Sequence, residues 1–96
     1  MKLLNVAPHS LVVEVYGYEF FVPLDTKYIA ISDSGIAVAF KHEPTYMEPH
    51  KTAPGRWFDY MGRDEGHIVA QFDLENTKPK NTLFKVGENN GRKLAA

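Results

Sequence analysis

The sequence predicts a mainly β protein: a small barrel or a strongly bent antiparallel sheet of about six strands in successive hairpins. Apolar and polar residues alternate with a period of two in segments 11–22, 28–40 and 67–74. Turn-forming residues lie within or between these segments, notably Gly17, Asp33-Ser34-Gly35 and the glycine-bounded stretch 62–66. No segment has a sustained helical period. Alternation with closely spaced turns is typical of half-buried strands that pair as hairpins.

Residues 11–22, LVVEVYGYEFFV, are expected to form the first strand or pair of strands. Val13 and Val15 alternate with Glu14, and the alternation resumes after Gly17. Gly17 can act as the turn of a tight hairpin or as a bulge within one bent strand. Because only one or two residues are available for the connection, we favour the hairpin.

Residues 27–41 carry the clearest hairpin signal in the chain. Asp33 can bond the backbone of a turn, and Gly35 can adopt a positive φ. Both faces of 28–40 are largely apolar. One face must therefore meet a second layer or the interior of a barrel, which favours closure over a single flat sheet.

The second half of the chain is expected to hold a long loop, a third hairpin and a short final element. Three prolines interrupt 42–55, which predicts an extended irregular loop. The segments RWFDYM and HIVAQFDL flank the turn at 62–66 and are expected to pair. Residues 75–86 hold a helical turn or a last short strand, and Pro79 limits any helix to one short turn near the C-terminus.

The alternation also predicts which side chains are buried. Each set lies on one face of its strand, and such faces are buried together. The residues expected to be largely buried are Ile29, Ile31, Ile36, Val38, Phe40, Ile68, Ala70 and Phe72.

Length and composition indicate one domain over residues 1–86. Residues 87–92 are polar and glycine-rich and are expected to form a loose tail, and 93–96 resemble cloning-vector sequence. Eleven basic and twelve acidic residues give a net charge of −1, which argues against a highly basic nucleic-acid coat and against an acidic DNA mimic. No apolar stretch approaches the roughly 20 residues of a membrane span. We expect a cytoplasmic protein with no membrane association.

No motif predicts catalysis or a cofactor. The absence of cysteine excludes disulfides, a thiol nucleophile and cysteine-based metal sites. His42 and Glu43 resemble the start of a zinc-protease motif, but Tyr46 replaces its second histidine and Pro44 forbids the required helix. His50 shares the loop with His42, and both are interpreted as exposed polar residues. We therefore expect no enzyme, no cofactor and no metal site.

One cluster of residues is typical of a binding surface. Its members combine Trp, Tyr, Met and Arg, which are enriched at the centres of protein interfaces, with nearby basic residues. They are Tyr46, Met47, His50, Lys51, Arg56, Trp57 and Tyr60. Core packing would explain about half of these aromatic side chains. Stacking on single-stranded nucleic acid, assisted by Lys41 and Arg63, is a further alternative.

Three stretches of the chain resemble small, mostly uncharacterised accessory proteins of tailed bacteriophages. They are YIAISDSGIAVAFKHEPTY, the aromatic strand RWFDY and the closing NTLFKV, within residues 11–86. The resemblance implies a phage setting and carries over no catalytic residue. It implies a small accessory protein that acts by binding a host macromolecule.

The predicted function is that of a non-enzymatic protein-binding module, a phage accessory protein that binds and modulates a host factor in the host cytoplasm. Loop 42–55 and the adjacent strand 56–60 would supply the contact surface, since binding residues are concentrated on loops held by a scaffold. Two alternatives remain: a small β-barrel that binds single-stranded nucleic acid, and a structural component of a virion. The sequence does not indicate an oligomeric state.

Overall fold

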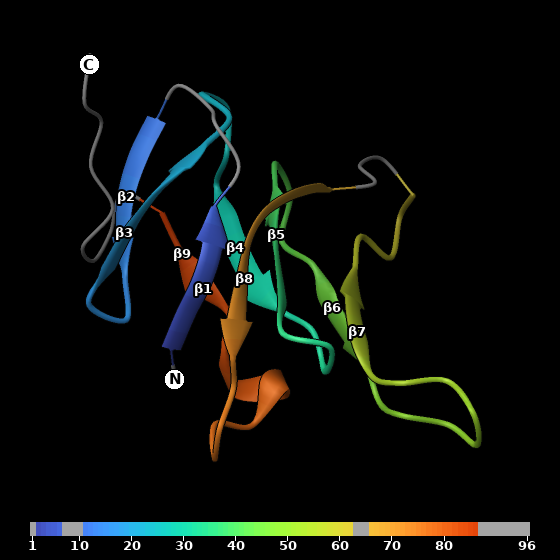
Figure 1. Cartoon of the computed structure of the whole chain (residues 1–96). Helices are drawn as coiled ribbons and strands as arrows, with labels where there is room; N and C mark the ends of the chain where they lie inside the picture. The colour runs from blue at the N-terminus through green and yellow to red at the C-terminus, as the bar shows by residue number, and fades with distance from the viewer. Residues whose placement is uncertain (1, 7–10, 63–65, 87–96) are drawn as a thin grey trace.

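The computed structural model describes residues 2–6, 11–62 and 66–86. Within them the protein is mainly β, with a curled antiparallel sheet that forms a half-barrel, two further hairpins and one 3₁₀ turn (Figure 1). The predicted fold class is confirmed. The expected tail 87–92 and the expected vector residues 93–96 lie outside the described residues.

The five-stranded sheet joins segments from both ends of the chain. Its strand order is β1 (Lys2–Val6), β8 (His67–Asp73), β5 (Ile36–Phe40), β4 (Tyr28–Ile31) and β9 (Phe84–Lys85), with every neighbouring pair antiparallel. Two hairpins accompany the sheet: β2 (Leu11–Val15) with β3 (Tyr18–Val22), and β6 (Thr45–Met47) with β7 (Arg56–Phe58). The described residues thus hold nine strands in place of about six, because β1, β6 and β9 are additional short strands.

The first two predicted hairpins form as predicted. Tyr16 and Gly17 connect β2 to β3 with φ angles of 54° and 82°, a two-residue turn with positive φ at both positions. Turns of this kind match the right-handed twist of the strands that they join, and the second position suits glycine. In the other hairpin, Ile29 pairs with Ala39 and Ile31 pairs with Ala37.

The β4–β5 hairpin is covered on both faces, which explains why both of its faces are apolar. Ile29 and Ile31 point toward the β2–β3 hairpin, whereas Ala30 and Phe40 point toward the β6–β7 hairpin. The sheet is therefore the middle layer of three at this point. The sequence predicted that at least one face would pack on a second layer, and in the structure both faces do.

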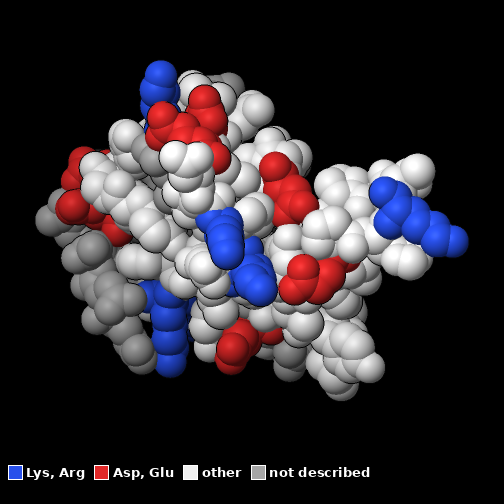
Figure 2. Space-filling model, turned by 90° about the horizontal axis from the view of Figure 1, so that it is seen from below, with Lys and Arg blue, Asp and Glu red and all other residues white. Residues whose placement is uncertain are grey.

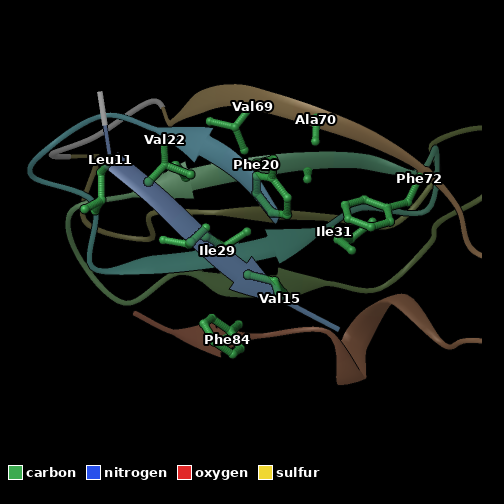
Figure 3. Close-up of a cluster of buried hydrophobic side chains, with 13 residues drawn as sticks. Leu11, Val15, Phe20, Val22, Ile29, Ile31, Val69, Ala70, Phe72 and Phe84 are labelled. Atoms are coloured by element: carbon green, nitrogen blue, oxygen red, sulfur yellow. The ribbon is translucent and has the colours of Figure 1, made fainter. Parts of the chain in front are cut away.

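The larger core lies between the sheet and the β2–β3 hairpin (Figure 3). Its buried members come from both layers and from β9, and several have no exposed surface. They are Leu11, Val13, Val15, Phe20, Val22, Ile29, Ile31, Ala37, Ala39, Val69, Ala70, Phe72 and Phe84. Phe72 meets the ring of Phe20 edge-on, with ring centroids 5.8 Å apart.

The predicted third hairpin is wrong. The strand around Trp57 pairs with β6, within the region expected to be an irregular loop, and β8 pairs with β1 and β5. Alternation indicates that a segment is a strand but not which strand it pairs with. The connection between β7 and β8 is long enough for the chain to pass from the hairpin layer back into the sheet, and Glu65 within it lies outside the described residues.

The predicted burial of Ile68 is also wrong, since its side chain is 64% exposed. Ala37 pairs with Ala70 and the next residue, Val38, pairs with Ile68, so Val69 is an extra residue in β8. This bulge reverses the alternation: Val69 is fully buried and Ile68 lies on the opposite face. Ile36 and Val38 are half-buried rather than buried, and the other five residues on the expected list are buried.

Residues 75–86 contain both of the elements that were expected for them, a helical turn and a short strand. A 3₁₀ turn, η1 (Pro79–Asn81), precedes β9. The buried hydroxyl of Thr82 accepts a hydrogen bond from the Ile31 N–H at 2.9 Å and lies 3.1 Å from the Ile31 carbonyl oxygen. Thr82 therefore takes the place of a strand partner at the end of β4.

Candidate protein-binding surface

The β6–β7 hairpin has two distinct faces. The pairs are Thr45 with Phe58, Tyr46 with Trp57, and Met47 with Arg56. Since side chains alternate between faces along a strand, Tyr46 and Trp57 share the face that packs on the sheet. The other face carries Thr45, Met47, Arg56 and Phe58, and Tyr60 continues it past the end of β7.

Trp57 is a core residue, so for this side chain core packing and not partner contact explains the aromatic ring. It is 9% exposed and forms the second buried cluster with Ala30 and Phe40. Its indole N–H donates to the Pro79 carbonyl at 3.1 Å, and its backbone N–H donates to the Ser32 hydroxyl at 3.3 Å. Trp57 thus anchors the hairpin to the sheet, and its buried side chain cannot contact a partner protein.

Asp33, which the sequence analysis treated only as a turn residue, holds the base of the hairpin. One carboxylate oxygen accepts the Tyr46 hydroxyl at 2.6 Å, and the other accepts the Gly55 N–H at 2.8 Å. The Asp33 N–H donates to the Gly55 carbonyl at 3.1 Å. We call Asp33, Tyr46 and Gly55 the hairpin clamp. No local sequence signal could have shown that Asp33 reaches residues 46 and 55.

The hairpin clamp alters the pKa of the Tyr46 hydroxyl and requires glycine at position 55. Hydrogen bonding to the Asp33 carboxylate, with smaller effects of desolvation and of the negative charges of Asp33 and Glu48, raises the pKa of Tyr46 to about 12. Gly55 is buried, and a Cβ atom there would overlap the Tyr46 hydroxyl. Only glycine therefore allows the close approach on which the clamp depends.

The outward face of the hairpin is an exposed stripe of apolar and cationic side chains. We call Thr45, Met47, Arg56, Phe58 and Tyr60 the outward stripe. Met47 is 41% exposed and Tyr60 is 75% exposed. The Arg56 guanidinium lies over the Phe58 ring, 5.5 Å from its centroid, and the rings of Phe58 and Tyr60 are 6.4 Å apart. Contacts of this geometry order the side chains along the stripe.

The tip of the hairpin carries the two remaining predicted residues. His50 and Ala53 exchange two backbone hydrogen bonds, of 3.0 and 2.8 Å, which close a turn of the loop. Lys51 lies in that turn with φ 49°, and both His50 and Lys51 are exposed. Figure 2 shows the projecting hairpin at the right with blue at its outer end, whereas red side chains lie nearer the body.

The predicted residues therefore divide into three groups. Met47, Arg56 and Tyr60 lie together on the outward stripe, and His50 and Lys51 lie at the tip beyond it. Tyr46 and Trp57 hold the hairpin in place from its inner face.

The structure is less suited to nucleic-acid stacking than the sequence indicated. Of the three aromatic residues proposed to stack, Trp57 is buried and the Tyr46 hydroxyl is bound to Asp33, which leaves Tyr60. Lys41 forms an ion pair with Asp25 at 3.2 Å. Arg63 lies outside the described residues.

Acidic and imidazole side chains are not grouped for metal binding in the described part of the chain. There, no three His, Asp or Glu residues are placed to share an ion. An open depression of about 420 Å³ lies beside the β4–β5 turn, lined in part by Asp33, Phe72 and Asp73. Both of these carboxylates already accept hydrogen bonds, Asp33 within the clamp and Asp73 from the Glu75 N–H.

Over the residues that the structure describes, no helix has the length and apolar character needed to cross a membrane. Neither a protein-family model, nor a curated protein, nor a solved structure matches the chain.

Proposed function

We propose that the chain is a non-enzymatic protein-binding module that makes contact through the outward stripe and the tip of the β6–β7 hairpin. The observation that carries this proposal is the exposure of Met47, Arg56 and Tyr60 together on one face. Met, Tyr and Arg are enriched at interface centres, and Tyr and Arg dominate measured binding hot spots. Apolar side chains that are exposed next to one another mark interaction sites more often than apolar side chains scattered singly over a surface.

The inner face of the hairpin supports the same proposal. Three hydrogen bonds link Asp33 to Tyr46 and Gly55, and Trp57 is packed and bonded at two atoms. The stripe is thus held in position before any partner arrives. A fixed surface avoids much of the conformational entropy that binding otherwise costs.

The biological setting in this proposal comes from the bacteriophage resemblance of residues 11–86. It supports a small accessory protein that binds and modulates a host factor in the host cytoplasm.

A pull-down from bacterial lysate tests the proposal. We expect the wild type to recover a specific partner and the Met47→Ser, Tyr60→Ser double variant to lose it. Both side chains are exposed, so the fold should tolerate the changes, whereas Tyr46→Ala would also break the clamp. Leu24→Ser is the matched control, because Leu24 is 65% exposed and precedes β4, outside the hairpin. Equal recovery by the wild type and the double variant would contradict the proposal.

Separate measurements test the two alternative functions, single-stranded nucleic-acid binding and a structural role in a virion. Oligonucleotide binding that weakens steeply between low and high salt would favour single-stranded nucleic acid as the ligand. Self-association in sedimentation, lost in the double variant, would favour a virion component.

A further inference from the structure

We infer that the outward stripe recognises an acidic segment of the partner protein, in which a carboxylate lies next to apolar side chains. The inference rests on the proposed function and specifies the chemistry of the partner. The carboxylate would pair with Arg56, and the apolar neighbours would cover Met47, Phe58 and Tyr60.

Arg56 is the residue that favours an acidic partner. Its guanidinium is exposed on the stripe and contacts the Phe58 ring, and no carboxylate of the described residues forms an ion pair with it. The planar guanidinium donates two parallel hydrogen bonds to a carboxylate. Because the contact with Phe58 restricts the side chain beforehand, pairing with a partner costs less entropy.

The rest of the stripe shows that the partner must also be apolar. Phe58 is half-buried, and Met47 and Tyr60 on either side of it are exposed. A purely acidic partner would leave these side chains in water. Packing of apolar groups around the Arg56 pair would instead exclude water from the ion pair, which is the arrangement seen at binding hot spots.

The exposed charges of the hairpin are of both signs. Arg56 lies on the outward stripe and Lys51 at the tip, whereas the exposed carboxylates are those of Glu48 near the tip and of Glu43 just before β6. The preference for an acidic partner therefore depends on Arg56, the cation that lies among the apolar side chains of the stripe.

The partner is expected to bind the face of the hairpin and not to extend its edge. The Trp57 N–H points to Ser32, away from β6, so Tyr46 and Trp57 form a pair without mutual backbone hydrogen bonds. The Tyr46 backbone groups therefore face the outer edge of β6. Pro44, which lacks an N–H, lies two residues before Tyr46 and removes the next donor that would face the same edge, so only a short edge remains for strand addition.

A random twelve-residue peptide library displayed on phage tests the inference directly. With the wild type as bait, we expect enrichment of peptides that place Asp or Glu beside an aromatic or aliphatic residue. Arg56→Gln should lose this acidic preference and bind the selected peptides about tenfold more weakly or worse. Lys27→Gln is the matched control: it removes one exposed positive charge just before β4, outside the hairpin, and should leave binding unchanged.

The outcomes separate the inference from the proposed function. Enrichment of neutral or basic peptides that still depend on Met47 and Tyr60 would overturn the acidic partner and leave the binding surface intact. Acidic peptides that bind wild type and Arg56→Gln equally would overturn the role of Arg56. Peptides that tolerate the Met47→Ser, Tyr60→Ser double variant would contradict the location of the site, and the absence of any enrichment would overturn the inference.

Discussion

Replacing Tyr46 with Phe removes one hydroxyl and thereby tests the hairpin clamp. The hydroxyl donates to the Asp33 carboxylate at 2.6 Å, and hydrogen bonds to charged groups contribute about 1.5–3 kcal/mol to stability. Tyr46 is only half-buried, and Asp33 keeps its bond from the Gly55 N–H, so the lower part of that range applies. We expect Tyr46→Phe to lower the free energy of unfolding by about 1.5–2 kcal/mol.

Urea unfolding at pH 7, followed by the fluorescence of the single tryptophan, measures this loss. Trp57 lies in the core, so its emission should change when the chain unfolds. Tyr60→Phe is the matched control, because it removes a hydroxyl from a side chain that is 75% exposed and should change stability by less than about 0.5 kcal/mol. Equal urea midpoints for wild type and Tyr46→Phe, with equal slopes, would refute the clamp.

The pH dependence gives a second test of the same bond. Folding raises the pKa of Tyr46 from its ordinary value of about 10 to about 12, so the contribution of its hydroxyl is fully present below pH 10. The advantage of wild type over Tyr46→Phe should therefore decline as the pH rises from 10 to 12, because the unfolded state loses this proton first. Absorbance of the tyrosinate near alkaline pH should show a step at about 12 that Tyr46→Phe lacks. An advantage that stayed constant across this interval would contradict the assignment.

Three further comparisons by urea unfolding test the packing and one buried hydrogen bond. Phe40→Ala should cost about 3–5 kcal/mol, because Phe40 is 2% exposed in the second cluster; a loss below 1 kcal/mol would contradict its burial. Val69→Ala should cost about 2 kcal/mol and Ile68→Ser less than about 0.5 kcal/mol, and the reverse order would refute the bulge in β8. Thr82→Val should cost about 1–3 kcal/mol, because the Ile31 N–H loses its partner, whereas Thr82→Ser keeps the hydroxyl and should remain close to wild type.

The class of the fold and its most local elements follow from the amino-acid sequence. Valine, isoleucine and aromatic residues in alternation are sufficient to define strands, and Gly17 and Asp33-Ser34-Gly35 are sufficient to define two turns. The two apolar faces of 28–40 correctly indicated that this hairpin must be covered. These features depend on residues a few positions apart, which is the range over which side-chain spacing carries information.

The sequence predicted which residue types make up the candidate surface, but not which of those side chains are exposed. Met47, Arg56 and Tyr60 were identified from residue types that favour interfaces, and the structure places them on one face. Trp57 has the same interface chemistry but lies inside, because it is the residue that covers Phe40 and Ala30. Residue type alone does not distinguish an aromatic side chain that packs the hairpin against the sheet from one that is exposed on its outer face.

The pairing of the strands and the roles of the polar side chains could not be predicted from the sequence and emerge from the folded structure. β7 pairs with β6 and not with β8, and the bulge at Val69 turns Ile68 to the outside. Asp33 binds Tyr46 and Gly55, 13 and 22 residues away, and Thr82 binds Ile31 across 51 residues. The physical reason is that alternation fixes only the local direction of a side chain, whereas pairing and hydrogen bonding depend on which distant segment the folded chain brings alongside.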